Sequence, residues 1–358
     1  MEPYIKEPLR LPCGLVLPNR LVKAAMAEGL ADKGHLPGAR SLGSTANGPR
    51  ADGIVGKKYA DACKQYGTPA IAQICHPGRQ SPRGAGERGL FEKAIAPSEV
   101  PLHIGNGFAA TIVRDIVFGV PKAMSHADID QLIAQFVNCA RVLAQCGFDG
   151  IEIHAAHGYL LYDYGGSAER RARVVLEIIR RIRSTVPSTF CIGIKLNSAD
   201  HDVSEFEDTM TQIQLISEAG VDFLEISGGT YEDPTMMGRG LRDELSNTKS
   251  WNTAYREAFF LDFATQTRKR FPNLILLLTG GFRTRKGIEA VLKDGVCDLV
   301  GIGRPAVLRP DFPRLVLDDI YSDQEARVVF SKVPIPFLAR LLQIRILGGG
   351  AETNGGLI

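Results

Sequence analysis

One join between a helix and a strand occurs three times in this chain. The segments CGFDGIEI (146–153), AGVDFLEI (219–226) and DGVCDLVGI (294–302) each place a glycine after a helix-like pattern and an aspartate before an apolar strand. The glycine suits the left-handed position that ends a helix, and the aspartate suits the short turn into the strand. Repeated units of this kind predict a parallel sheet that is covered by helices on its outside.

Seven segments have the composition of buried strands: LVKAAM near the start, AIAQI at 70–74, GIEIHAA, CIGIKLN, DFLEISGG, LILLLTGG and DLVGIGR. That number favours a (β/α)8 barrel over a doubly wound sheet, and no GxGxxG sequence follows the first strand. An eighth strand has no candidate, because residues 32–58 are rich in glycine and are predicted to be loop or disordered. The predicted fold is therefore α/β, a TIM barrel whose second βα unit is shortened or missing.

Apolar residues at helical spacing separate these strands. Ser125 and Asp128 form a capping-box sequence before a helix that stops at Gly147. Ser204 and Glu207 are predicted to cap another helix in the same way. Further helices are predicted over 167–184, near 255–270 and over 284–294. The arginines of the first of these lie mostly opposite an apolar stripe, which is typical of an outer barrel helix with a solvated face.

The composition excludes several classes of partner. A net charge of +2 gives no electrostatic reason to expect nucleic acid or an anionic membrane, and no apolar run is long enough to span a bilayer. The seven cysteines are scattered without CxxC pairs, which favours reduced thiols and a cytoplasmic location over a disulfide framework. The sequence leaves a homo-oligomer open.

Glycines end the last two predicted strands. In α/β barrels a phosphate group often binds after strands seven and eight, at the carboxyl ends of the strands. Gly280 and Gly281 would let backbone N–H groups approach an anion, and Gly303 with Arg304 would add an open loop and a guanidinium. The alternative is that these glycines only make tight turns and that Arg304 forms a surface ion pair.

Two other strands carry polar residues where a barrel interior should be apolar. Gln73 could both donate to and accept from the pyrimidine half of a flavin, and Lys195 could stabilise negative charge at N1 and O2 of the reduced ring. The alternative for Lys195 is a structural ion pair with Glu152 or Glu225 inside the barrel mouth.

The strand IEIHAA contains His154 near its end and is followed by His157 and Tyr159. These residues could be hydrogen-bonded core residues, or the histidines could bind a metal with His76 or Asp163. A third interpretation is that both histidines donate to a substrate carbonyl oxygen while Tyr159 supplies a proton. The sequence offers no clear third ligand at a nearby strand end, so the metal site is the weakest of the three.

Seven motifs together resemble the Old Yellow Enzyme group of FMN-dependent ene-reductases and NADH:flavin oxidoreductases. They are LPCGLVLPNRLVKAAMAEGLAD, AQICHPGRQSP, IEIHAAHGYLL, DYGGSAERRARVVLEIIRRIR, GIKLNSAD, TGGFRTR and GIGRP. The resemblance implies FMN at the carboxyl face of the barrel, NADPH or NADH as reductant, and a small-molecule enone as substrate.

The resemblance also implies a role for each motif residue. The flavin would be contacted by Ala25, Met26, Ala27, Gln73 and Lys195, and its phosphate by Gly280, Gly281, Gly303 and Arg304. The substrate carbonyl would be bound by His154 and His157, and Tyr159 would protonate its α-carbon. The implied cycle is ping-pong: the nicotinamide reduces the flavin and leaves, and the alkene then takes a hydride.

The chain departs from the family pattern at Ala27, where relatives often have a hydroxyl or thiol residue, at Lys195, where many have arginine, and in two shortened segments. The helix and second strand expected between EGLAD and HPGRQ are shortened, and Tyr162 alone stands between HGYLL and DYGGS. These losses support an alternative function, a degenerate barrel that binds ligand without turnover. We expect one FMN-binding domain over 1–332 and a glycine-rich C-terminal tail over 333–358.

Overall fold

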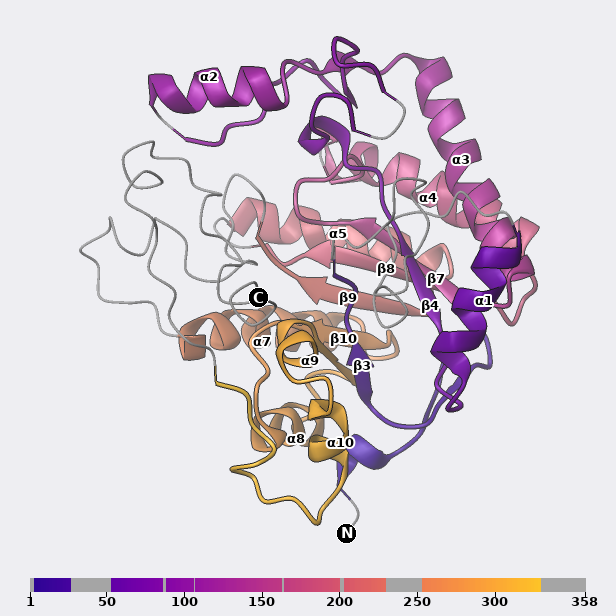
Figure 1. Cartoon of the computed structure of the whole chain (residues 1–358), viewed down its shortest axis with the longest axis vertical. Coiled ribbons are helices and arrows are strands. Elements are labelled where there is room, and N and C mark those ends of the chain that lie inside the picture. The colour runs from indigo at the N-terminus through magenta and orange to yellow at the C-terminus, as the bar shows by residue number, and fades with distance from the viewer. Residues whose placement is uncertain are drawn as a thin grey trace.

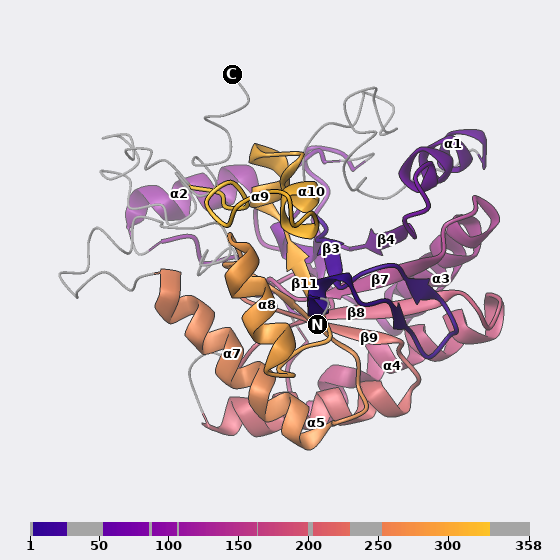
Figure 2. The ribbon, with the colours of Figure 1, turned by 90° about the horizontal axis from the view of Figure 1, so that it is seen from below.

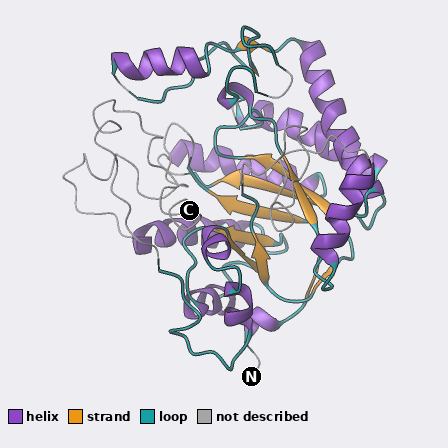
Figure 3. Cartoon of the chain, viewed as in Figure 1, coloured by secondary structure: helices purple, strands orange, loops and turns teal. Residues whose placement is uncertain are grey.

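A parallel sheet with helices outside it forms the centre of the computed structural model (Figures 1 and 3). The structure describes residues 3–26, 53–85, 88–105, 107–162, 164–199, 203–229 and 253–329. Its main sheet has seven strands in the order β3-β11-β10-β9-β8-β7-β4. Their bounds are β3 Leu21–Lys23, β4 Ile71–Ile74, β7 Gly150–Ala155, β8 Cys191–Asn197, β9 Phe223–Ser227, β10 Leu276–Thr279 and β11 Leu299–Ile302. All seven predicted strands are confirmed.

Helices alternate with these strands along the chain. Their bounds are α1 Gly53–Lys64, α3 His126–Gln145, α4 Ala168–Thr185, α5 Val203–Glu218, α7 Thr253–Arg270, α8 Arg285–Lys293, α9 Arg304–Leu308 and α10 Phe312–Leu317. Figure 2 shows α3, α4, α5 and α7 along the outside of the strands. None of the described helices combines the length and the apolar character that a membrane span needs.

The sheet has two ends, β3 and β4, and no strand in the described residues joins them. Most of the segment in which the second βα unit is predicted to be shortened or missing lies outside the described part. The prediction of a loop over 32–58 is wrong at its end, because α1 begins at Gly53. Tyr59, Ala60 and Cys63 follow one another at helical spacing on its core-facing side, a pattern that we missed among the glycines. Residues 32–52 lie outside the described part.

The three repeated joins have the same backbone geometry. Gly147, Gly220 and Gly295 follow α3, α5 and α8 with positive φ values of 88°, 87° and 66°. This is the left-handed conformation that ends a helix and that glycine adopts without a steric penalty. The sequence prediction for these positions is confirmed.

The aspartates of the three joins also act alike. Each carboxylate accepts a hydrogen bond from a backbone N–H of a neighbouring strand segment and pairs with a basic side chain that belongs to a helix. The three sets are Asp149 with Ala70 and Lys64, Asp222 with Ile192 and Arg183, and Asp298 with Leu276 and Arg268. Each aspartate therefore ties one strand to its neighbour and to an outer helix at the amino end of the sheet.

The capping predictions have mixed outcomes. Ser125 and Asp128 form the capping box of α3, with the Ser125 Oγ accepting from the Asp128 N–H. Thr284 caps α8 by accepting from Gly287 N–H. The prediction for Ser204 is wrong, because α5 already includes Val203 and an N-cap residue stands before the first helical residue.

Smaller elements lie at the two faces of the barrel. The hairpin β1 Leu9–Arg10 and β2 Val16–Leu17 packs Leu11 and Leu17 under the sheet, next to Cys191 and Phe223. The segment between β4 and α3 holds η2 Gly78–Gln80, the strand pair β5 Ile95–Ala96 and β6 Lys122–Ala123, and helix α2 Phe108–Val117, while η1 Tyr4–Lys6 lies near the N-terminus. Figure 1 shows α2 at the periphery, away from the sheet.

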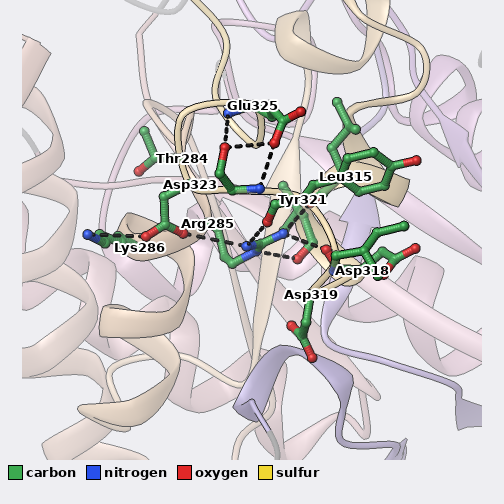
Figure 4. Close-up of polar contacts among 12 residues, drawn as sticks. Thr284, Arg285, Lys286, Leu315, Asp318, Asp319, Tyr321, Asp323 and Glu325 are labelled. Carbon is green, nitrogen blue, oxygen red and sulfur yellow. Dashed lines mark hydrogen bonds and ion pairs between the residues drawn. The ribbon is translucent and has the colours of Figure 1, made fainter.

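Arg285 fastens the last described segment to α8 (Figure 4). Its guanidinium donates to the carbonyls of Leu315, Val316, Asp318 and Tyr321 and pairs with Asp323 at 3.5 Å. The planar fork of arginine suits several acceptors at once, and a cation at the end of α10 complements the helix dipole. Arg285, part of the TGGFRTR motif, thus has a structural role. The predicted tail over 333–358 lies outside the described residues.

Candidate active site

The carboxyl ends of the strands gather the predicted site residues into two groups. Register pairs Gln73 with Glu152, His154 with Lys195, and Lys195 with Glu225 across β4, β7, β8 and β9. The second group follows β3, β10 and β11, where Thr279 pairs with Gly301. Parallel strands end at the same edge of the sheet, so one face of the barrel carries both groups.

His157 is brought back toward His154 by a tight turn at the end of β7. His157 and Gly158 have positive φ values of 61° and 73°, which reverse the chain within two residues. The Nδ1 atom of His157 lies 3.2 Å from Nε2 of His154, and the two rings meet edge to face. The HPGRQ motif supports this turn, because the N–H of Leu160 donates to the carbonyl of His76.

Hydrogen bonds fix the tautomers of this histidine pair. The backbone N–H of Ala156 donates to Nδ1 of His154, so neutral His154 carries its hydrogen on Nε2 and donates it to His157 Nδ1. His157 therefore carries its own hydrogen on Nε2, 3.0 Å from the Ser227 hydroxyl oxygen. The chain of donors runs in one direction, from the backbone through both rings to Ser227.

Burial keeps both imidazoles neutral. It lowers the pKa of His154 well below its usual range, and the neighbouring His157 and Lys195 lower that pKa further. Burial, followed by Lys195, lowers the pKa of His157 to about 3. Tyr159 is partly buried, and its ring stands edge-on to His154 with centroids 4.7 Å apart. The site therefore holds two neutral imidazoles, whose N–H groups point to His157 and Ser227, and a phenol.

Lys195 lies in a buried charge network. Its ammonium is 2.9 Å from Glu225 Oε1 and 4.0 Å from Glu152 Oε2. Gln73 donates from Nε2 to the same Glu152 oxygen at 2.6 Å. The structural ion pair that the sequence left open is thus present, and contact of Lys195 with a flavin stays a prediction.

The pKa values show how the network stays neutral. Burial and the nearby Glu225 raise the pKa of Glu152 well above its usual range. Burial also acts to raise the pKa of Glu225, but the Lys195 ammonium together with hydrogen bonds from Glu152, Lys195 and Thr279 outweighs it, and the net pKa is lowered. Burial acts against the charge of Lys195, whereas Glu225 and Glu152 favour it, and its pKa is raised. These directions favour a charged pair of Lys195 and Glu225 beside a protonated Glu152.

The glycine-rich strand ends lie beside the first strand. The N–H of Ala24 donates to the carbonyl of Ile302, which brings Ala25 and Met26 next to Gly303. A Cβ added to Gly303 would lie 3.4 Å from the sulfur of Met26. Gly280 and Gly281 have positive φ values of 135° and 81° after β10. Arg304 follows Gly303 as the first residue of α9, and Ala27 lies outside the described residues.

Three side chains around His157 were not predicted. Asn197 and Ser227 end β8 and β9, and they could have been found by the same signal that marked Gln73, a polar residue at a strand end. Gln80 lies in η2 and has no such signal. The described residues hold one cluster of metal-ligand side chains, Cys13, Cys191 and Asp222, at the amino end of the sheet, and Asp163 lies outside the described residues.

Comparison with known proteins identifies the family. Residues 55–323 match the model of the NADH:flavin oxidoreductase / NADH oxidase family. The chain is 39% identical to the NADH-dependent flavin oxidoreductase iliE of Hypocrea jecorina (strain QM6a), over 97% of each protein. The chain belongs to the Old Yellow Enzyme family. It is therefore an oxidoreductase that uses FMN and a reduced nicotinamide nucleotide.

Other family members extend the likeness. The chain is 39% identical to iccE of Talaromyces variabilis, over 96% of this chain and 94% of the relative. Among solved structures, an Old Yellow Enzyme homologue from Zymomonas mobilis has a TM-score of 0.67 at 22% identity, covering 87% of this chain and 92% of that one. A 2-naphthoyl-CoA reductase has a TM-score of 0.71 at 19% identity, covering 98% of this chain and 58% of that one. These structures confirm the barrel fold.

The alignment with iliE also bears on the shortened unit. It is 393 positions long, although this chain has only 358 residues, so the relative has residues that this chain lacks. That difference agrees with the deletions predicted from the family motifs.

The residues present fit FMN. Glycines without side chains end the adjacent strands β10 and β11, and Arg304 begins the next helix, which is the donor set that a phosphate requires. Gln73 is half-buried and donates its amide nitrogen to Glu152, so its carbonyl oxygen can accept from a ring N–H. The phosphate would lie on the side of β10 and β11, and the pyrimidine on the side of β4 and β8.

Proposed function

We propose that the chain reduces the C=C bond of α,β-unsaturated carbonyl compounds with NADH or NADPH. The observation that carries this proposal is the pair of neutral imidazoles, 3.2 Å apart, with the Tyr159 ring beside them. The same three residues stand in the family motif HAAHGY. When bound, FMN supplies the hydride for this chemistry.

The histidines account for the rate of the proposed reaction. A carbonyl oxygen seated against the two rings would accept from Nε2–H of His154 and of His157, in place of their contacts within the protein. Hydride addition places negative charge on that oxygen, so these donors bind the transition state more tightly than the substrate. Removal of one such donor costs about 3–4 kcal/mol in comparable sites. Low pKa values keep both rings as neutral donors at neutral pH.

Tyr159 is proposed to complete the reduction by giving its phenolic proton to the α-carbon. Tyr159→Phe should slow alkene reduction by about 100-fold, within the range of general acid catalysis, and leave flavin reduction by NADH unchanged. Anaerobic stopped-flow absorbance measures the two half-reactions separately. Equal losses in both would remove Tyr159 from the role of proton donor.

The decisive experiment for the whole proposal is an absorbance spectrum of the protein with FMN. Flavin bands should bleach on anaerobic addition of NADH or NADPH and return on addition of cyclohexenone. A protein that cannot be reconstituted with FMN would falsify the proposal. If the flavin bands bleach and no enone of a panel restores them, the protein does not reduce these alkenes. Its activity as an NADH:flavin oxidoreductase would still stand.

A second candidate is ligand binding without turnover. The observation that favours it is the sheet end between β3 and β4, which no described strand closes. FMN binding with no bleaching by either nicotinamide nucleotide would select this function over the first.

A further inference from the structure

His157 has a backbone conformation that histidine rarely adopts. Its φ of 61° is the one positive value at a non-glycine residue in the described part of the chain. A side chain with a Cβ is strained in this left-handed region, and such strain persists only where the surroundings impose it. The reason for the conformation must therefore lie in the contacts around His157.

Two buried amide side chains hold the backbone of His157. The Oδ1 atom of Asn197 accepts from the His157 N–H at 3.1 Å. The Nε2 atom of Gln80 donates to the His157 carbonyl at 2.8 Å. Asn197 is 8% exposed and Gln80 is 3% exposed. One amide comes from the end of β8 and the other from η2, so two separate segments hold the same residue.

The two amides differ in their other contacts. The Oε1 atom of Gln80 is buried and has no hydrogen-bond partner among the described residues. Burying the Gln80 amide with one polar atom unpaired lowers the stability of the folded protein. We therefore expect its one hydrogen bond, to the His157 carbonyl, to serve the site. Asn197 is itself fixed by a bond from its Nδ2 to the carbonyl of Gly229.

We propose that Gln80 and Asn197 are positioning residues that set the imidazole of His157 against His154. The proposal rests on the proposed function, because it assigns the residues that aim one of the two donors at the substrate oxygen. Rotation of His157 to a negative φ would swing its ring away from His154, and the paired donors would be lost. Alkene reduction, which needs both imidazoles, should become slower, whereas flavin reduction by NADH should keep its rate.

Asn197→Leu and Gln80→Met test this assignment, because each keeps the size of the side chain and removes the hydrogen bond to His157; Asn197→Leu also removes the bond to Gly229. In the full-length FMN-loaded protein, each should slow alkene reduction by about 10- to 100-fold, as small displacements of catalytic groups do. FMN content and flavin reduction by NADH should stay unchanged. In 15N NMR spectra, the ring signals of His157 should shift toward those of an imidazole without a neighbouring ring.

Two control variants sharpen the test. Asn197→Asp keeps an oxygen that accepts from the His157 N–H but cannot donate to the Gly229 carbonyl, so it should restore the His157 ring signals and part of the alkene reduction. Gln214→Met removes an exposed amide on α5 and should change neither measurement. If Asn197→Leu does not fold, Gln80→Met carries the same prediction.

Unchanged His157 signals in both variants, or alkene reduction within twofold of the unmodified protein, would overturn the proposal. Equal losses in both half-reactions would also overturn it, because that result assigns the two amides a general structural role. If the unmodified protein reduces no alkene, the proposed function fails. The NMR comparison still decides whether Gln80 and Asn197 orient His157.

Discussion

At the residue scale, one backbone N–H determines the chemistry that the site can perform. Ala156 donates to Nδ1 of His154, and this fixes which nitrogen of each imidazole carries hydrogen. If His154 took the other tautomer, two N–H groups would meet head-on at Ala156 and the chain of donors would break. The direction of the donors is therefore a property of the turn after β7 as well as of the histidines.

The depressed pKa of His157 also links folding to pH. Its pKa falls from an ordinary value of 6.5 to about 3 in the folded protein, so between these pH values the unfolded chain binds a proton that the folded protein excludes. The stability contributed by neutral His157 is complete above about pH 6.5 and is lost as pH falls toward 3. Each unit by which the pH falls in this range lowers the free energy of unfolding by up to about 1.4 kcal/mol.

We expect His157→Gln to flatten this dependence. Glutamine cannot take up the proton, so the free energy of unfolding of the variant should fall less steeply from pH 6.5 to pH 4.5 than that of the unmodified protein. Urea titrations at several pH values measure both curves. Parallel curves would show that His157 titrates normally in the folded protein.

At the element scale, the repeated joins show why the fold was readable from sequence. Glycine and aspartate act at these joins through contacts that lie nearby in the chain or in the adjacent unit. Because the join occurs three times, the copies together support the prediction of a parallel sheet covered by helices. The strands could also be predicted from the sequence, because short apolar runs bounded by turn residues are typical of buried strands. Helix α1 was missed because its short apolar pattern lies next to glycines.

Only some of the site residues could be predicted from the sequence, for a related reason. His154, His157 and Tyr159 lie within six residues, whereas their supports come from distant parts of the chain. Gln80, Asn197 and Ser227 are 77, 40 and 70 residues from His157. A polar residue at a strand end marks Asn197 and Ser227 as candidates, but no local pattern encodes their contacts with His157, and Gln80 has no such signal.

The joins lead to a stability prediction. Asp222 is 2% exposed and accepts from Ile192 N–H at 2.7 Å and from Arg183 at 2.8 Å. Asp222→Ala leaves both donors without this partner and should lower the free energy of unfolding by about 3 kcal/mol. Asp130→Ala, at an exposed position of α3, is the control and should change it by less than about 0.5 kcal/mol. Urea unfolding of both variants checks the difference, and equal effects would contradict the structural role of the join.

At the scale of the whole molecule, the sheet ends at β3 and β4 decide whether the barrel holds FMN firmly. Ala25 and Met26 follow β3, and β4 carries Gln73, so residues expected to contact the flavin are held by two strands that no described strand connects. In a closed barrel each strand is held by two neighbours, whereas a terminal strand has one. Relative motion of these two strands would weaken FMN binding without altering any contact residue.

This leads to a prediction on closing the barrel. Replacement of residues 27–52 by the corresponding segment of the Hypocrea jecorina relative should supply a pairing partner for β3 and β4. FMN should then dissociate at least about tenfold more slowly, as followed by flavin fluorescence. Because a ligand at 100 times its Kd adds about 2.7 kcal/mol to stability, a tenfold gain in affinity should add about 1.4 kcal/mol at fixed excess FMN.

A Gly/Ser segment of the same length is the control, since loop length alone changes stability by only about 0.6 kcal/mol per doubling. Equal FMN dissociation rates in the two chimeras would mean that the sheet ends do not limit binding. The short second unit would then affect only the architecture of this family member, with its flavin site held by the remaining strand ends.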